Sequence, residues 1–167
     1  PSIGGKDSMS GTFENINVPP MLMAFGITTV DAEQVISPEL KYEGNRLYLI
    51  KHTPLANHMP DVEQLKANWK YVHEQIQAEN IVSGYALGFG GLAEAICKMS
   101  FGNGLDARIT YDEKELFNYD YGSILVESEV ALDYPNAILV GEVTDGEESE
   151  LSINGKKFDI FELMAVN

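Results

Sequence analysis

The sequence predicts an α/β or α+β fold in which helices flank a mixed β-sheet. Short apolar runs of strand length alternate with two longer segments of helical periodicity. Gly, Pro and Asn residues mark the connections, and Asn154-Gly155 lies between two short runs, which is a strong hairpin signal. With 167 residues, of which 44% are hydrophobic and 22% charged, the chain is large enough to bury a real core.

The first third of the chain predicts an arm followed by strands. Residues 1–19 are rich in glycine and polar side chains and are expected to form a loop or extended arm, with residues 20–167 as a single domain. A Pro-Pro pair leads into residues 21–30, whose apolar composition predicts a buried strand. We expect a short helical turn over residues 32–36 and a second strand over residues 46–52.

Residues 61–79 carry the clearest helical pattern. Asp61 suits the N-cap, and Gln64 three residues later completes a capping-box pattern. Apolar residues recur at steps of three and four and predict one buried face: Val62, Leu65, Trp69, Val72 and Ile76. Trp69 is therefore expected in the core.

The chain is organised around residues 84–109, which predict a glycine-rich loop, a short helix and an exit into a strand. The apolar face of this helix consists of Leu92, Ala95, Ile96 and Met99. Gly102 and Gly104 suit a helix end, where a positive φ is often required.

Gly90 and Gly91 stand where this helix begins. Exposed backbone N–H groups there, aided by the helix dipole, would favour an anion such as phosphate. Alternatively, the glycines only allow the helix to pack closely against its neighbours, because a short glycine-rich turn is a weak motif.

The C-terminal part predicts further strands. A short helix is expected over residues 112–117, where acidic residues in the first turn suit the helix dipole. Strands are expected over 123–128 and 137–143, followed by a hairpin of 151–153 and 157–160. The apolar tail, residues 161–167, is expected to dock on the body.

The net charge of −15 argues against nucleic acid and against an anionic membrane surface as partners. The single cysteine, Cys97, excludes an internal disulfide and is expected to be a small buried residue, consistent with a reducing cytoplasm. The sequence shows no membrane-spanning stretch and no signal peptide. His52 and His58 lack further ligands at useful spacing, so no metal site is expected there.

A second candidate site lies at the start of the chain. Its residues combine backbone flexibility, one cation, one carboxylate and hydroxyls: Gly4, Gly5, Lys6, Asp7, Ser8 and Ser10. The glycine amides and Lys6 could hold a phosphate, with Asp7 or Ser8 on a metal ion, although the spacing is not that of a P-loop. The alternative is a flexible, solvated terminus. Since the chain opens inside this motif without Met, it is expected to be a piece of a longer protein.

Three motifs together resemble one enzyme family: Gly-Gly-Lys-Asp-Ser-Met-Ser at 4–10, Gly-Gly-Leu-Ala-Glu-Ala at 90–95 and Phe-Gly-Asn-Gly-Leu-Asp at 101–106. The chain resembles the C-terminal synthetase subdomain of phosphoribosylformylglycinamidine synthase, which belongs to the superfamily of aminoimidazole ribonucleotide synthetase. The resemblance covers nearly the whole chain in the same order. The first motif is specific, whereas the second is shared across the superfamily.

This resemblance implies part of an ATP-dependent amidoligase of purine biosynthesis, which forms a C–N bond with ammonia from glutamine. It implies ATP or ADP and Mg²⁺ bound between a preceding synthetase domain and a domain like this one, with a glutaminase domain as a further partner. Here Lys6 would contact phosphate, Asp7 and Ser8 would position it, and Gly90 and Gly91 would donate amides. No catalytic residue is assigned to this chain, which alone is expected to be inactive. It is also expected to self-associate through the face where the missing domain docks.

The sequence departs from the family before the glycines, where the family motif reads His-Asp-x-Ser-Asp-Gly-Gly-Leu. Ala86 and Phe89 replace its two aspartates, and Gly88 replaces its serine. Mg²⁺ thereby loses the hard oxygen ligands that it prefers. Three interpretations stay open: a working nucleotide half-site, a structural domain with a vestigial half-site, or another ATP-dependent member of the superfamily.

Overall fold

The computed structural model describes residues 2–8, 11–19, 21–146 and 149–167. The chain divides into two compact units, residues 1–35 and residues 36–167. We call them the N-terminal unit and the body, and we describe each by itself.

The described residues of the N-terminal unit form two antiparallel strand pairs and one turn of 3-10 helix. Strand β1 (Ser2–Ser8) pairs with β4 (Met21–Gly26), and β2 (Gly11–Phe13) pairs with β3 (Ile16–Val18). The helical turn η1 (Ala32–Gln34) confirms the expected turn after residue 31.

The strand expected over residues 21–30 is present as β4, but the prediction that it is buried was wrong. Residues 23–30 are exposed, because β4 pairs with β1 and does not join the sheet of the body. The β1–β4 pairing also crosses the expected boundary between residues 19 and 20. The division into an arm and a single domain stays a prediction.

The body is built on a seven-stranded sheet in the order β11-β10-β7-β9-β5-β8-β6. Its strands are β5 (Arg46–Ile50), β6 (Ile81–Ala86), β7 (Asp106–Ile109), β8 (Ile124–Ser128), β9 (Ala137–Thr144), β10 (Glu150–Ile153) and β11 (Lys156–Asp159). Strands β10 and β7 are parallel and the other neighbours are antiparallel, so the sheet is mixed. This confirms the predicted fold class, although residues 84–86 end strand β6 and do not form a loop.

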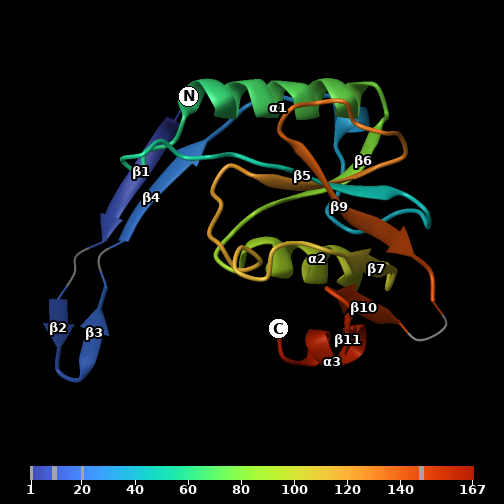
Figure 1. The fold of residues 1–167 in the computed structure, drawn as a ribbon. Coiled ribbons are helices and arrows are strands. Elements are labelled where there is room, and N and C mark those ends of the chain that lie inside the picture. The colour runs from blue at the N-terminus through green and yellow to red at the C-terminus, as the bar shows by residue number, and fades with distance from the viewer. Residues whose placement is uncertain (1, 9–10, 20, 147–148) are drawn as a thin grey trace. The chain divides into compact units, whose positions relative to one another are not determined.

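Helices α1 (Val62–Gln77) and α2 (Gly91–Phe101) lie on opposite faces of the sheet (Figure 1). The predicted face of α2, Leu92, Ala95, Ile96 and Met99, is completely or almost completely buried in the larger core cluster. The smaller cluster joins Val72 of α1 to Tyr48, Ile50 and Val126 of the sheet. Because side chains alternate along a strand, Leu49 and Ile50 enter different clusters.

The start of α1 is as predicted, because the Asp61 side chain accepts a hydrogen bond from the Gln64 amide over 3.0 Å. The expectation that Trp69 lies in the core was wrong: 49% of Trp69 is exposed, and its indole N–H donates to the Gly122 carbonyl. Asn68 is buried instead, where it donates to the Lys51 carbonyl and accepts from Tyr134.

The buried carboxylate of Glu127 in β8 connects three segments of the body. Its Oε2 accepts from the Lys41 amide and the Ser83 hydroxyl, each over 2.8 Å. Its Oε1 accepts from the Tyr42 amide over 3.0 Å and from the Asn45 side-chain amide over 2.7 Å. These four donors satisfy a carboxylate that would otherwise be costly to bury.

The C-terminal elements agree with the sequence in part. Strands β10 and β11 form the expected hairpin, and Asn154 and Gly155 have the positive φ values, 51° and 77°, that such a turn requires. Helix α3 (Ile160–Ala165) follows, with Ile160 buried but Phe161 and Val166 mostly exposed, so the tail docks less closely than expected. The prediction of a helix over residues 112–117 was wrong, since this segment forms turns.

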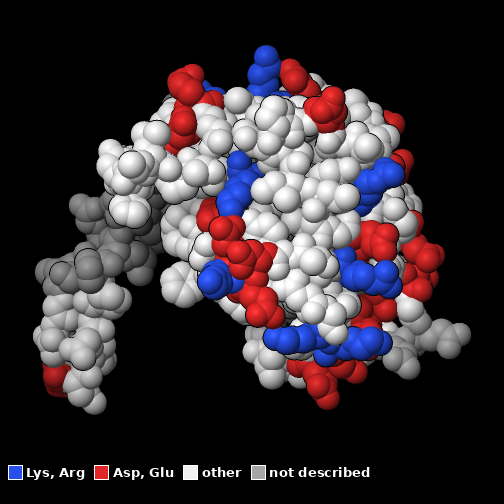
Figure 2. All heavy atoms as spheres, in the orientation of Figure 1, with Lys and Arg blue, Asp and Glu red and all other residues white. Residues whose placement is uncertain are grey.

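Figure 2 shows lysine and arginine side chains interleaved with acidic ones on the visible face of the body, without a continuous basic stripe. This pattern offers no evident surface for a phosphate backbone. Among the described residues, no helix has both the length and the apolar character needed to cross a bilayer.

Candidate functional site at the start of helix α2

The two groups of predicted phosphate-binding residues lie in different units. Gly4, Gly5, Lys6, Asp7 and Ser8 belong to β1, whereas Ser10 lies outside the described residues. In an extended strand successive N–H groups point to opposite sides, so consecutive amides of β1 do not converge as in an anion-binding nest. The backbone of β1 therefore does not form an anion-binding nest. Phosphate binding by the side chains of Lys6, Asp7 and Ser8 stays a prediction.

Gly90 and Gly91 form the first turn of α2, where exposed amides were expected. The structure shows both amides bonded within the chain. The Gly90 N–H donates to Oε2 of Glu94 over 2.8 Å, and the Gly91 N–H donates to the Gly88 carbonyl over 3.2 Å. A side-chain carboxylate thus occupies the position at the helix start that a phosphate oxygen was expected to take.

Glu94 is held from two directions. Its other oxygen, Oε1, forms an ion pair with Lys98 over 2.9 Å, one helical turn further on. The hydrogen bond from Lys98, followed by that from the Gly90 amide, holds the pKa of Glu94 below its ordinary value. The carboxylate therefore stays charged at neutral pH and remains a hydrogen-bond acceptor for the helix start.

Gly91 shows why the chain needs glycine here. Its φ is +63°, and a Cβ atom at this position would lie 2.6 Å from the Asn118 carbonyl oxygen and 2.8 Å from that of Leu116. The Ala93 amide donates to the same Leu116 carbonyl over 3.0 Å. The segment 116–118 therefore covers the first turn of α2, and this packing accounts for Gly91 without any ligand.

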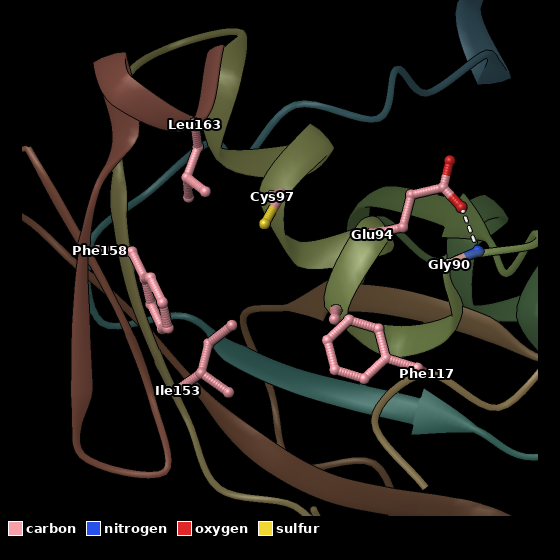
Figure 3. A pocket seen from close by; sticks show the side chains of 8 residues that line it. Gly90, Glu94, Cys97, Phe117, Ile153, Phe158 and Leu163 are labelled. Carbon is pink, nitrogen blue, oxygen red and sulfur yellow. Dashed lines mark hydrogen bonds between the residues drawn. The ribbon is translucent and has the colours of Figure 1, made fainter. Parts of the chain in front are cut away.

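A pocket of about 290 Å³ lies beside this turn and is lined mainly by apolar side chains. Figure 3 shows Cys97 opposite Leu163, Phe158 and Ile153, whereas Glu94 points away toward Gly90. Burial raises the pKa of the Cys97 thiol, so this side chain is a small, half-buried apolar residue and a poor nucleophile. The pocket has an apolar lining and no convergent charged groups.

The residues before the glycines do not fit a Mg²⁺–phosphate group. Ala86 ends β6, Leu87 is buried, and Phe89 is 86% exposed to solvent. Neither Ala86 nor Phe89 offers a side-chain oxygen, and no cluster of three or more potential ligands from His, Cys, Asp and Glu was found in the described part of the body.

The sequence-based prediction missed Glu94 and the segment 116–118 as neighbours of the glycines. Glu94 had a usable signal, because an acidic residue four positions after a helix-starting glycine can fold back onto its amide. The contact between Gly91 and residues 116–118 had no signal in the sequence, since it depends on tertiary packing. Both ring nitrogens of His52 have partners within the chain: Nδ1 contacts the Tyr121 carbonyl and Nε2 accepts from the Asp61 amide.

Comparisons with known proteins show similarity to PurL, a subunit of phosphoribosylformylglycinamidine synthase. No family model matches the chain. The PurL subunit of phosphoribosylformylglycinamidine synthase from two strains of Lactobacillus delbrueckii subsp. bulgaricus is 29% identical over 108 residues. The match covers 60% of this chain, and the chain spans 15% of the length of these relatives.

Solved structures of PurL from Thermotoga maritima share the fold. The complex with ADP has a TM-score of 0.62 and 12% identity, over 79% of this chain and 27% of that one. A second structure, at 11% identity, has the same TM-score and covers 85% of this chain and 28% of that one. Together the matches confirm the resemblance to a PurL synthetase domain that the motifs predicted.

Proposed function

We propose, from this similarity to PurL, that the chain acts as one domain of a larger ATP-dependent ligase of purine biosynthesis. The sequence match to PurL and the shared fold support this assignment. The small share of each relative that the chain spans supports a role inside a longer enzyme. In that enzyme a preceding synthetase domain and a glutaminase domain would be its partners, and glutamine would supply the ammonia.

Within this enzyme, we propose that the body is a structural domain whose half-site at α2 is vestigial. The observation that carries this proposal is the 2.8 Å hydrogen bond from the Gly90 amide to Glu94. A phosphate at this position would have to displace a carboxylate that Lys98 also holds. It would also lack carboxylates at positions 86 and 89 for a bridging metal ion.

The second candidate function is a nucleotide half-site formed from the N-terminal unit. The observation that favours it is that the specific motif at 4–8 is intact and lies in one regular strand. In this role Lys6 would contact the phosphate of the nucleotide, and Asp7 or Ser8 would coordinate Mg²⁺.

The experiment is a calorimetric titration of ADP, with and without Mg²⁺, into the chain extended upstream by the preceding synthetase domain. For the structural role we expect that neither Lys6→Ala nor Glu94→Gln changes ADP affinity by more than about twofold, a difference of less than 0.5 kcal/mol. A loss of ADP affinity of about tenfold or more in Lys6→Ala, without a loss in Glu94→Gln, would contradict the structural role and support the second candidate function.

The pathway assignment has a separate test. We expect the longer enzyme to hydrolyse ATP only when formylglycinamide ribonucleotide and an ammonia source are present, and the 167-residue chain alone to show no such activity. Substrate-dependent hydrolysis by the isolated chain would contradict the proposal that it works as one domain of a larger enzyme.

A further inference from the structure

A second pocket of the body lies between the segment after β5 and the turn before β8. Its volume is about 370 Å³, and its lining includes Pro54, His58, Tyr119, Asp120 and Tyr121. Small-molecule sites commonly have volumes of this order. None of the residues in the predicted nucleotide half-site lines it, so it is separate from the proposed function.

Asp120 is the acidic group of this pocket, and it lacks a direct partner. The residue is half-buried, and within the described ranges no hydrogen bond or ion pair holds its carboxylate. Burial raises the pKa of Asp120 above its ordinary value; the charge of Lys51 acts in the opposite direction, and that of Glu115 raises the pKa further. A partly desolvated carboxylate without a counter-ion is unfavourable, so a bound cation would stabilise it.

The cations and imidazoles near Asp120 are engaged elsewhere or exposed. The Lys51 ammonium is bonded to Glu115 over 2.5 Å and to the Tyr111 hydroxyl over 3.0 Å. The His52 ring contacts the Tyr121 carbonyl through Nδ1 and the Asp61 amide through Nε2, so both of its ring nitrogens have partners within the chain. His58 is exposed at the pocket rim.

The residues before and after Asp120 in the sequence are tyrosines that line the same pocket, and their rings contact each other. Tyr119 is 43% exposed and Tyr121 58% exposed, and their ring centroids lie 3.5 Å apart at an angle of 59°. The Phe89 ring meets Tyr119 edge-on at 5.5 Å and extends the aromatic group. Exposed aromatic faces next to a carboxylate are the elements that recognise organic cations, through cation–π attraction and charge-assisted hydrogen bonds.

We propose that this pocket binds a guanidinium or ammonium group, with the Asp120 carboxylate as counter-ion and the exposed ring surface of Tyr119 and Tyr121 as its aromatic contact. The cation belongs either to a small molecule or to an arginine or lysine side chain of a peptide. The net charge of −15 favours the approach of such a ligand at low salt.

The test is a ¹H–¹⁵N NMR titration of the whole chain at pH 7.5 with two probes of the same shape, methylguanidinium and methylurea. We expect methylguanidinium to shift the amides of residues 119–121 in a saturable manner, and methylurea to shift them little. Equal shifts with the two probes, or shifts centred elsewhere, would overturn the proposal.

Two substitutions and their matched controls identify the groups responsible. Asp120→Asn keeps the shape and removes the charge, and is expected to weaken binding about tenfold, since charge-assisted hydrogen bonds are the stronger class. Tyr121→Leu is expected to weaken it roughly threefold through the lost ring face. Asp133→Asn and Tyr42→Leu alter exposed residues outside the pocket and are expected to leave affinity unchanged.

A folding defect is distinguished by the amide spectrum of each variant away from residues 119–121. An unchanged spectrum with unchanged affinity in Asp120→Asn would refute the role of the carboxylate. The source of the cation is distinguished by a blocked tripeptide with a central arginine and its citrulline counterpart. Binding of the arginine peptide points to a protein partner, whereas binding of methylguanidinium alone points to a small molecule.

Discussion

Oε2 of Glu94 lies 2.8 Å from the backbone nitrogen of Gly90 and accepts its hydrogen bond. The interaction joins the fourth residue of α2 to the glycine at its N-cap, which has no side chain of its own to cap the helix. Glu94 therefore performs the capping function from inside the helix. The same carboxylate places a negative charge at the positive end of the helix dipole.

Glu94→Gln is expected to destabilise the body by about 0.5–1 kcal/mol at pH 7, because the substitution removes the negative charge at the helix start and the ion pair with Lys98. Because the pKa of Glu94 is lowered in the folded state, its contribution is present above the unfolded pKa and is lost as the pH falls through the folded value. Urea unfolding at pH 7 and pH 3 measures the difference, which should shrink at the lower pH.

The matched control is Glu74→Gln in α1, which breaks an exposed ion pair with Lys70 at the same spacing but no cap. We expect a change of about 0.3 kcal/mol or less. A loss in Glu94→Gln no larger than in this control would mean that the charge of Glu94 at the helix start adds nothing to stability beyond an ordinary exposed ion pair.

Gly91→Ala is expected to cost about 2–4 kcal/mol, because it combines a left-handed φ with a collision against the backbone of residues 116–118. Gly104→Ala separates the two effects, since Gly104 has nearly the same φ, +64°, and open space at its Cβ position. That variant is expected to cost about 1–2 kcal/mol. Equal losses of unfolding free energy in the two variants would show that segment 116–118 moves aside readily.

Glu39 is expected to titrate far below an ordinary glutamate. Hydrogen bonds from Lys41 and then Ser37, both over 2.6 Å, lower the pKa of Glu39 from 4.5 to about 2. The stabilisation from this interaction is present above pH 4.5 and is lost as the pH falls toward 2. NMR titration of the side-chain carboxyl carbon measures this pKa directly.

In Lys41→Gln the pKa of Glu39 should rise toward its ordinary value, and in Ser37→Ala it should rise less, since the Lys41 hydrogen bond is the larger cause. Glu39 titrating near 4.5 in the unsubstituted chain would contradict this Lys41–Glu39 geometry.

Glu127→Gln is expected to be the most damaging of the conservative carboxylate changes, at about 3 kcal/mol. Two of the donors to Glu127 would then face an amide NH₂ group in a buried position, where unsatisfied polar groups cost about 1–3 kcal/mol each. Glu129→Gln, two residues along and exposed, is the control and should change stability by less than about 0.5 kcal/mol. Similar urea midpoints for the two variants would contradict this role of Glu127.

Local signals in the sequence predicted the elements that local interactions determine. The Asp61–Gln64 cap fixed the start of α1 to within one residue, and the Asn154-Gly155 turn gave the β10–β11 hairpin. The apolar face of α2 was also predicted, because its spacing alone identifies it. In each case the residues that determine the element are close together in the sequence.

Features that depend on distant segments were not predicted. Trp69 fits the apolar stripe of α1, yet it is half exposed, and Asn68 occupies the buried position, where Lys51 and Tyr134 from distant segments bond its side chain. Strand β6 was missed because Gly84 weakens its strand pattern, although its pairing with β8 fixes it in the sheet. At the candidate site the glycines were identified, but the carboxylate that bonds Gly90 and the segment that covers Gly91 were not.

The strand order also determines how this chain can associate with other molecules. The two edges of the seven-stranded sheet are β11 and β6. Strand β11 is only four residues long and carries Lys156 and Lys157. The outer side of β6 forms a bridge through Ser83 to Ser37. Short, charged or occupied edges discourage the addition of a further strand. Association of the body with itself or with another domain should therefore use its side-chain surfaces, which protects the sheet from amyloid-like extension.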